Sequence, residues 1–405
     1  MSNADFVSRA RAVLYPNYKP MPVAFVRGEG CTLTDADGKS ILDMAAGVAV
    51  CSVGHSHPRF AKALAEQAAT LVHVSNYVYN TVNVEAAERL TKLSGFSRAF
   101  FCNSGGEANE ALLKLARYHF FKHGQPERRR VIAFNNGFHG RTLGALSMTG
   151  TAKYREGFGD LGPVTHVPFG DVDAVRAAIG PDVAAIIVEC VQGEGGVLPA
   201  PDGFFAALRS LCDEHGALFF VDEVQTGVGR LGSWFGFQQF GVTPDAISLA
   251  KGLGGGVPIG AMLTSEALAE SLPAGMHGTT FGGNALASRA ALTVLDILAD
   301  EGLVEAASEK GAQLESLLQG VLTRHPKVCE GTRGRGLLRG LVLAQGFAAR
   351  DVLPLALDAG VLLTAAGERV LRFTPPLVVT AAELELAVSR VEGVIAHLES
   401  TARAA

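Results

Sequence analysis

A unit that recurs along the first two thirds of the chain constrains the fold most. In each copy a short apolar run leads into a turn, and most of these turns are rich in glycine. The runs cover residues 98–103, 131–134, 183–189, 217–222, 246–250 and 261–264. Continuous apolar runs bounded by glycine are typical of strands buried on both faces, and helical stretches such as 204–214 lie between them. This alternation predicts an α/β fold with a mostly parallel sheet and helices on both sides.

The pattern changes after Asn284, where long helical stretches come first and strands follow. The expected helices cover 285–298, 303–322 and 381 to about 398, and the expected strands cover 338–343, 361–364 and 370–373. We therefore predict a second, smaller α+β domain. Asp37-Gly38 is a hairpin turn signal near the N-terminus, and we expect that segment to pack with the small domain. The expected divisions are 1–60 for the N-terminal segment, 61–300 for the large domain and 301–405 for the C-terminal small domain.

Composition argues against several classes of function. The chain has 35 lysines and arginines against 40 aspartates and glutamates, a net charge of −5, whereas nucleic-acid-binding proteins are usually basic. The only basic run, Arg128–Arg130, is expected in a solvated loop. No segment approaches the roughly 20 apolar residues of a membrane span, and no apolar signal-peptide segment is visible near the N-terminus. The six cysteines are scattered without C-x-x-C pairs, which predicts reduced thiols, no metal site and a cytoplasmic enzyme.

Ser104-Gly105-Gly106-Glu107 follows an apolar run and opens a helical stretch. Serine is a good N-cap, and a glutamate three residues later can complete a capping box. The same residues could form an anion site, because free N–H groups at a helix N-terminus attract phosphate and glycine lets the phosphate approach. The two interpretations are compatible with each other.

Two ionisable residues end neighbouring apolar runs. Asp222 follows Ala217–Val221, where a carboxylate is costly unless a cation meets it, although it could instead cap a following helix. Lys251 ends the next run, before a glycine-rich loop. A lysine partly desolvated in such a place has a lowered pKa and is nucleophilic, although a lone lysine there could simply extend to the surface. Parallel sheets bind ligands at the carboxyl ends of their strands, where both residues are expected.

An anion site, a carboxylate and a lysine at one sheet edge match the needs of pyridoxal 5′-phosphate (PLP). The aldehyde of PLP forms a Schiff base with a lysine, its protonated ring nitrogen is held by a carboxylate, and its phosphate occupies an anion site. We therefore expect PLP as the cofactor.

Several longer motifs resemble, in the correct order, those of the class III, ornithine-aminotransferase-like PLP-dependent aminotransferases. They include GHSHP at 54–58, SGGEANE at 104–110, GFHGRT at 137–142, VDEVQTG at 221–227, SLAKGL at 248–253, HGTTFGGN at 277–284 and LRFTPPL at 371–377. The resemblance implies a PLP-dependent transferase of fold type I, whose large domain holds a mostly parallel seven-stranded sheet beside the smaller α+β domain. It also implies a homodimer with active sites at the interface.

The resemblance assigns roles toward the cofactor. Lys251 is expected to carry the Schiff base, Asp222 to pair with the ring nitrogen, and Gln225 to contact the ring hydroxyl. Phe138 is expected to stack on the ring, with ordinary core packing as the alternative. Thr280 is expected to reach the phosphate in the partner subunit. The full expected set is Ser104, Gly105, Gly106, Phe138, Asp222, Gln225, Lys251 and Thr280.

Four residues are expected to bind substrate by the same resemblance. Arg141 matches the arginine that holds a substrate carboxylate, although it could instead cap a helix. Glu194 and Arg372 are expected to form a gate that pairs for one substrate and frees Arg372 for the carboxylate of 2-oxoglutarate; a structural ion pair is the alternative. Thr279 is expected against substrate, and together with Thr280 it would act across the dimer interface.

Three residues depart from the family pattern. Gly106 replaces a threonine and so removes one expected hydrogen bond to phosphate, without affecting the backbone cradle. Cys190 replaces the proline after Glu189, and Cys51 replaces an asparagine before the GHSHP motif. The sequence offers no explanation for either cysteine.

The expected reaction is transamination of N2-acetyl-L-ornithine with 2-oxoglutarate, giving N-acetyl-L-glutamate 5-semialdehyde and L-glutamate in arginine biosynthesis. TTFGGN and FHGRTLGALSMTG resemble the segments of family members that use this donor. Ornithine, succinylornithine, succinyl-diaminopimelate, lysine and 4-aminobutyrate are alternative donors within the class, and a related racemase is another possibility. A non-catalytic regulator that kept the fold is the alternative from another class, and the intact Lys251 and Asp222 argue against it.

Overall fold

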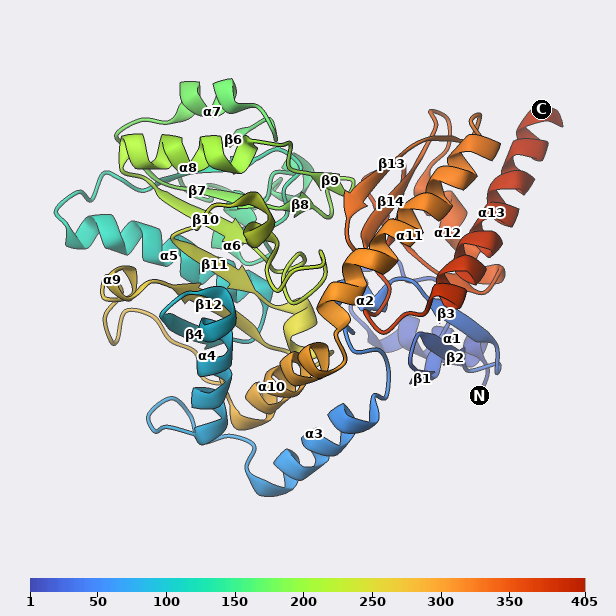
Figure 1. Cartoon of the computed structure of the whole chain (residues 1–405), viewed down its shortest axis with the longest axis horizontal. Coiled ribbons are helices and arrows are strands. Elements are labelled where there is room, and N and C mark those ends of the chain that lie inside the picture. Colours follow the sequence, from blue (N-terminus) through green and yellow to red (C-terminus); the bar gives the residue numbers. More distant parts are fainter. Residues whose placement is uncertain (405) are drawn as a thin grey trace.

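Seven strands form one sheet in the computed structural model, which describes residues 1–404 (Figure 1). In spatial order they are β4 (Arg98–Cys102), β12 (Gly260–Thr264), β11 (Ala246–Leu249), β10 (Leu218–Asp222), β7 (Val183–Glu189), β5 (Arg130–Phe134) and β6 (Val164–Val167). Strands β11, β10, β7, β5 and β6 run parallel, whereas β12 is antiparallel to both of its neighbours. The expected mostly parallel seven-stranded sheet is confirmed.

The central strands send side chains into two separate cores. Every residue of β7 is buried, and its successive side chains point to opposite faces. Val188 belongs to the core that includes helix α8 (Phe204–His215), whereas Ile187 belongs to the core that includes helix α5 (Gly105–Lys122). Burial on both faces explains why these strands read as continuous apolar runs rather than as an alternation.

Further helices surround the sheet. They are α3 (Pro58–Thr70), α4 (Thr81–Ser94), α6 (Leu143–Met148), α7 (Val172–Ala178), α9 (Glu266–Ala269) and α10 (Ala285–Asp300). A short pair, β8 (Val191–Gln192) and β9 (Leu198–Pro199), follows β7. Among these helices, α10 packs most extensively against α3 and α4.

The C-terminal part forms an antiparallel sheet covered by long helices (Figure 1). Its strands are β13 (Cys329–Arg335), β14 (Leu338–Leu343), β17 (Val370–Phe373) and β16 (Thr364–Ala366), and its helices are α11 (Leu303–Arg324), α12 (Ala349–Asp358) and α13 (Ala381–Ala404). The helices expected from 285, 303 and 381 begin at those residues. The strand expected over 361–364 is two elements, because β15 (Val361–Leu362) leaves for another sheet.

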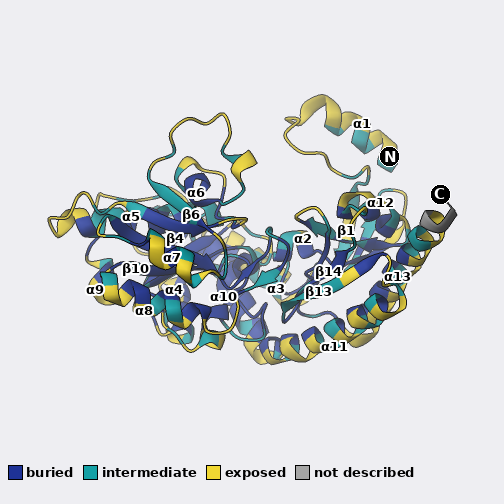
Figure 2. Ribbon diagram, turned by 90° about the horizontal axis from the view of Figure 1, so that it is seen from above, coloured by how far each residue is buried: buried dark blue, intermediate teal, exposed yellow. Residues whose placement is uncertain are grey.

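The N-terminal segment shares that other sheet. Strands β1 (Phe25–Glu29), β2 (Thr32–Asp35) and β3 (Ser40–Asp43) are antiparallel neighbours, and β15 adds in parallel to β3. The turn between β2 and β3 contains Gly38 at φ +86°, a conformation that glycine adopts without strain. Helix α1 (Asn3–Val13) buries none of its residues. Its first residue, Asn3, donates hydrogen bonds to Asp35 and Asp37, and the rest of the helix projects away from the chain (Figure 2).

The arginine run 128–130 is only in part the solvated loop that was expected: Arg128 and Arg129 lie in a loop and Arg129 is exposed, but Arg130 is the first residue of β5. Arg130 begins β5 and forms an ion pair with Asp182 at 2.6 Å. Arg128 donates hydrogen bonds to the carbonyl oxygens of Val183 and Gly216. Internal contacts therefore occupy the side chains of Arg128 and Arg130. Within residues 1–404, no helix combines the length and the apolar character that a membrane crossing needs.

Gly311 tests the packing of helix α11 against the turn between β13 and β14. A β-carbon there would lie 2.4 Å from the carbonyl oxygen of Gly336, so backbone would have to move. Alanine in place of glycine inside a helix ordinarily stabilises by about 1 kcal/mol. We expect Gly311→Ala instead to lower the free energy of unfolding by about 1–3 kcal/mol, because the site is already filled.

Gly393 in α13 is the matched control, because a β-carbon there would have no neighbour within 4 Å. Gly393→Ala should raise the free energy of unfolding by about 0.5–1 kcal/mol. Urea unfolding followed by circular dichroism measures both variants. Equal stabilisation by the two substitutions would contradict the close contact at Gly311.

Candidate active site

A cavity of about 300 Å³ lies at the carboxyl ends of the central parallel strands. Most of the residues singled out in the sequence meet there. Those that line it are Ser104, Gly105, Gly106, Phe138, Glu194, Asp222, Gln225 and Lys251. The topology explains this meeting, because β10 ends at Asp222 and β11 ends just before Lys251, and the two strands are parallel neighbours.

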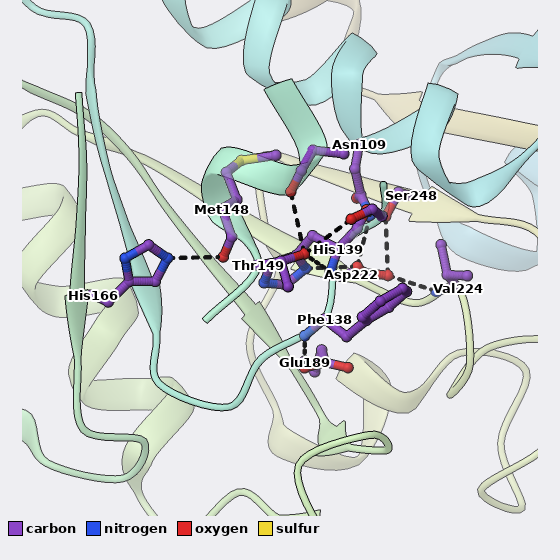
Figure 3. Close-up of polar contacts among 12 residues, drawn as sticks. Asn109, Phe138, His139, Met148, Thr149, His166, Glu189, Asp222, Val224 and Ser248 are labelled. Atoms are coloured by element: carbon purple, nitrogen blue, oxygen red, sulfur yellow. Dashed lines mark hydrogen bonds and ion pairs between the residues drawn. The ribbon is translucent and has the colours of Figure 1, made fainter. Parts of the chain in front are cut away.

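Asp222 is buried, and hydrogen bonds occupy both of its oxygens (Figure 3). Its Oδ2 accepts from Asn109 Nδ2 and from His139 Nδ1, each at 2.7 Å. Its Oδ1 accepts from the Val224 N–H at 2.9 Å and from Ser248 Oγ at 3.3 Å. Burial alone would raise the pKa of Asp222, but these donors, His139 first, hold it below its ordinary value. The carboxylate is therefore kept anionic, and no helix begins after it for it to cap.

Lys251 lies in a strained backbone conformation at the end of β11. Its φ is +37°, in the left-handed region that side chains other than glycine rarely adopt. Such a conformation costs on the order of 1–3 kcal/mol and is concentrated at functional sites. Burial lowers the pKa of the Lys251 ammonium, and the nearby Glu194 opposes that change. The amine therefore loses its proton more readily than a surface lysine does.

Ser104 caps helix α5, but the expected capping box is displaced by one residue. Ser104 Oγ accepts from the Glu107 N–H at 3.2 Å, as predicted. The Glu107 carboxylate instead accepts from the N–H and Nδ2 of Asn103, each at 2.8 Å. This arrangement fixes the start of α5 at the edge of the cavity.

The first turn of α5 presents Gly105 and Gly106 to the cavity. Their N–H groups have no acceptor within the helix, since the first N–H groups of any helix lack one. A β-carbon on Gly105 would lie 2.7 Å from Val224 Cγ1, so glycine is required there. A β-carbon on Gly106 would approach nothing closer than 3.8 Å. The site therefore has room for the β-carbon of a threonine, and packing does not require glycine there.

Gln225 and Phe138 complete the match to PLP. The Nε2 atom of Gln225 is buried and has no hydrogen-bond partner among the described residues, so a ring hydroxyl at the cavity would satisfy it. Phe138 is half-buried and lines the cavity, unlike ordinary core. Together with the carboxylate, the lysine and the free N–H groups, these residues fit the cofactor.

Three buried residues of the site were missed in the sequence. His139 and Asn109 are the donors to Asp222, and Glu189 accepts the Phe138 N–H at 3.2 Å. Burial raises the pKa of Glu189 to about 8. Burial opposes protonation of His139, but the hydrogen bond to Asp222 and its charge raise the His139 pKa overall. A signal existed for Glu189, which ends an apolar run as Asp222 does; Asn109 gave none beyond its place on the apolar face of a helix.

Glu194 and Arg372 form a direct ion pair beside the cavity. Arg372 is 2% exposed, and its Nη1 lies 2.5 Å from Glu194 Oε1 and 3.1 Å from the Gly193 carbonyl oxygen. Arg372 Nε also donates to Thr364 Oγ1 at 3.0 Å. Burial would raise the pKa of Glu194, but the charge of Arg372, followed by those of Lys251 and Arg141, holds it below its ordinary value.

Arg141 lies next to this cavity without an acidic partner. Its guanidinium makes no hydrogen bond or ion pair with the described residues, and the N-cap of α6 is Thr142 rather than Arg141. Its Cζ atom instead lies over the ring of Tyr154 at 3.6 Å and over that of Phe138 at 5.5 Å. The helix-capping alternative is therefore wrong.

Thr279 and Thr280 lie outside the cavity of Lys251. Both line a second cavity of about 960 Å³ on the same chain. Thr279 Oγ1 accepts from Asn103 Nδ2 at 3.1 Å and from the Gly282 N–H at 3.2 Å. Within one chain, neither threonine lines the cavity of Lys251, although Asn103, the hydrogen-bond donor to Thr279, does line it.

One of the two unexplained cysteines has a structural account. Cys190 is buried, and its thiol donates toward Glu223 Oε1 at 3.5 Å. The thiol thus adds a donor to a buried carboxylate, which a proline cannot do. Nothing in the structure explains Cys51.

Comparison with known proteins agrees with this geometry. A family model described as aminotransferase class III matches residues 13–395. The chain belongs to the class III aminotransferases. Enzymes of this class use PLP, so the groups around Lys251 and Asp222 are those of a PLP-dependent aminotransferase.

Individual relatives share nearly the whole chain. Acetylornithine aminotransferase of Myxococcus xanthus is 49% identical, over 95% of this chain and 96% of that protein. The crystal structure of an ornithine aminotransferase from Toxoplasma gondii superposes with a TM-score of 0.95 at 34% identity, covering 99% of this chain and 96% of the other. N-acetylornithine aminotransferase from Stenotrophomonas maltophilia gives a TM-score of 0.85 at 37% identity, covering 98% of this chain and 100% of the other.

The pairing of His139 with Asp222 predicts a pH-dependent stability. His139 has a raised pKa, so its protonated form adds stability below the unfolded histidine pKa of about 6.5, and that contribution is lost as the pH rises through the folded value. We expect His139→Gln to lower the free energy of unfolding of the apoenzyme by about 3–5 kcal/mol at pH 6. The loss should be smaller at alkaline pH, as urea unfolding at several pH values would measure.

His166 is the control with the opposite sign. Burial lowers the pKa of His166 to about 4, and its Nε2 lies 3.3 Å from the Met148 carbonyl oxygen (Figure 3). The folded state therefore loses stability as the pH falls through about 6.5. The free energy of unfolding of wild type should therefore increase relative to that of His166→Gln as the pH rises. If the loss in free energy of unfolding changed with pH in the same direction for both variants, His139 would not be protonated in the folded state.

Proposed function

We propose that this chain transfers the δ-amino group of N2-acetyl-L-ornithine to 2-oxoglutarate, giving N-acetyl-L-glutamate 5-semialdehyde and L-glutamate in arginine biosynthesis. The observation that carries the proposal is the 49% identity to acetylornithine aminotransferase of Myxococcus xanthus over 95% of this chain. The site supports it with one lysine, one buried anionic carboxylate and two arginines for substrates that carry carboxylates.

PLP, when bound, supplies an electron sink for the negative charge left on a substrate carbon that loses a proton. Lys251 Nζ is the base of this step, since its lowered pKa favours the neutral amine at the cavity. The same Nζ returns the proton from its protonated form. Asp222, held anionic by His139 and Asn109, would hold the cofactor through its ring nitrogen and keep that nitrogen protonated.

The two arginines differ in their readiness to bind a carboxylate. Arg141 has free N–H donors, which form the bidentate fork that a carboxylate favours. Arg372 is neutralised by Glu194 and becomes available only when Glu194 turns away. We propose that the closed pair serves the amine donor, whose carboxylate meets Arg141, and that the open pair serves 2-oxoglutarate.

Ornithine is the second candidate donor. It is favoured by the TM-score of 0.95 to ornithine aminotransferase from Toxoplasma gondii. Ornithine comes second because the chain is more identical in sequence to acetylornithine aminotransferases, at 49% and 46%, than to that ornithine aminotransferase, at 34%. Succinylornithine, succinyl-diaminopimelate, lysine and 4-aminobutyrate remain alternatives within the class.

We also propose a homodimer in which Thr280 reaches the phosphate in the partner subunit and Thr279 lies against its substrate. Tyr77 and Tyr79 are 98% and 97% exposed, and Phe281 is 61% exposed. Tyr77 and Thr280 line the same large cavity. Exposed rings grouped on one surface mark an interaction site, and a second copy would bury them while completing both active sites.

The organisation of the chain is part of the proposal. We propose a large PLP-binding domain over 61–300 and a small domain over 301–405. Residues 1–60 would belong with the small domain, supported by the pairing of β3 with β15. We place the enzyme in the cytoplasm, supported by six free cysteines.

Half-reactions with single amine donors test the function. The holoenzyme is mixed with N-acetylornithine, ornithine, N-succinylornithine or 4-aminobutyrate, without 2-oxoglutarate, and the loss of the yellow cofactor absorbance is followed. N-acetylornithine should give the highest ratio of rate to apparent dissociation constant, by at least tenfold. A higher value for another donor overturns the substrate assignment, and no reaction with any donor overturns transamination.

Lys251→Ala should abolish covalent attachment of the cofactor and nearly all turnover, because no other amine lines the cavity as described. We expect a loss of at least about 10³-fold in kcat, in the range of a missing nucleophile and base. Absorbance spectra and steady-state assays measure both effects. Lys62→Ala, on a lysine whose side chain is 77% exposed, is the control and should behave as wild type.

Sedimentation velocity tests the dimer. The wild-type enzyme should sediment as a dimer. The double variant Tyr77→Ser and Tyr79→Ser should have a larger dimer dissociation constant, because it removes two exposed rings from the proposed interface. Activity should fall with the fraction of dimer. A fully active wild-type monomer would contradict the shared active site.

A further inference from the structure

Arg141 is held next to the active-site cavity by aromatic rings alone. Its guanidinium makes no hydrogen bond or ion pair within the described chain, whereas Arg372 is bound to Glu194. The closest ring is that of Tyr154, whose centroid lies 3.6 Å from Arg141 Cζ. This separation is short for a cation over a ring, since contacts out to about 6 Å still attract.

Tyr154 is itself fixed by a second ring. It ends the short 3₁₀ turn Ala152–Tyr154, is half-buried, and meets Phe138 edge to face, with 6.4 Å between centroids and 90° between the ring planes. Phe138 lines the cavity. The three side chains therefore form one contiguous cluster that runs from the proposed cofactor site to Arg141.

The geometry of the guanidinium decides what this cluster does. A ring covers the flat face of the group, whereas its five N–H donors point outward in the plane. Stacking on Tyr154 therefore immobilises Arg141 and leaves its donors available. An acidic partner would also immobilise it but would occupy the same donors that a substrate carboxylate needs. Without either, the long side chain would lose considerable conformational entropy on binding.

We propose that Tyr154 is a specificity-determining residue that holds Arg141 ready for the carboxylate of the amine donor. The enzyme then prefers donors with a carboxylate remote from the reacting amine over amines that lack one. The inference rests on the proposed function, because it assigns the carboxylate of that donor to Arg141. Tyr154 is thereby added to the proposed substrate-recognition residues as one that acts through Arg141, without a hydrogen bond of its own to substrate.

The test compares two donors that differ only in the carboxylate. N-acetylputrescine is N-acetylornithine without its carboxylate. Half-reactions are measured with the holoenzyme of wild type, Tyr154→Phe and Tyr154→Leu. Tyr154→Leu should lower the ratio of limiting rate to apparent dissociation constant for N-acetylornithine by about 3- to 30-fold, the range of a lost cation–π contact, mainly through the dissociation constant. It should change the value for N-acetylputrescine by less than twofold, and Tyr154→Phe should match wild type with both donors.

A binding measurement separates recognition from chemistry. N-acetyl-L-norvaline carries the same carboxylate and acetyl group but has no amine to react. Titration calorimetry with the holoenzyme should show its Kd rising by about 3- to 30-fold in Tyr154→Leu and unchanged in Tyr154→Phe. In Arg141→Gln, which has no cation to lie over the ring, adding Tyr154→Leu should have almost no further effect on this Kd.

Several outcomes overturn the inference. Equal losses with both donors would mean that Tyr154 only supports the fold of the site, and no loss would mean that Arg141 needs no ring. A Phe variant as impaired as the Leu variant would assign the role to the hydroxyl. The proposed function fails separately, if the wild-type enzyme converts ornithine but not N-acetylornithine. The inference is then tested with ornithine against 1,4-diaminobutane, which differ by the same carboxylate.

Discussion

Parallel pairing of β10 with β7 and β11 sets the position of the whole site. In this register Asp222 lies beside Glu189 on one neighbouring strand and beside Ser248 on the other. The strands are apolar along their length, so their polar ends collect at one edge of the sheet. A buried carboxylate without a cation would cost several kcal/mol, and His139 removes that cost for Asp222 through a 2.7 Å contact. The sheet can therefore present a permanent anion to a bound ring.

The three cations at or beside the cavity are held in different ways. Burial lowers the pKa of Lys251 and so favours the neutral amine that a proton transfer needs. Arg372 is paired with Glu194, and Arg141 is held by rings. One arginine is therefore neutralised by a carboxylate, whereas the other has no acidic partner among the described residues. An enzyme that accepts two different carboxylic acids in turn can use this difference to bind each of them.

The sheet and the cofactor could be predicted from the sequence because their signals are local. Burial on both faces makes each central strand a continuous apolar run, and a charge at the end of such a run stands out, as at Asp222 and Lys251. Strand β13, from Cys329, was missed because it is mostly half-buried and contains glycine and arginine. The partners of Asp222 were missed for another reason. Asn109 and His139 are 113 and 83 residues away from it in the sequence, so only tertiary packing identifies them. The same holds for Tyr154, which no motif marked.

The central claim is that the amine at position 251 binds the cofactor covalently within the fold described. Reduction of the holoenzyme with borohydride makes that attachment permanent, and peptide mass spectrometry then locates it. The added mass of the reduced cofactor should lie on the peptide that contains Lys251, and on that lysine alone. A modification on any other lysine, or an unmodified Lys251 in a fully active holoenzyme, would contradict it.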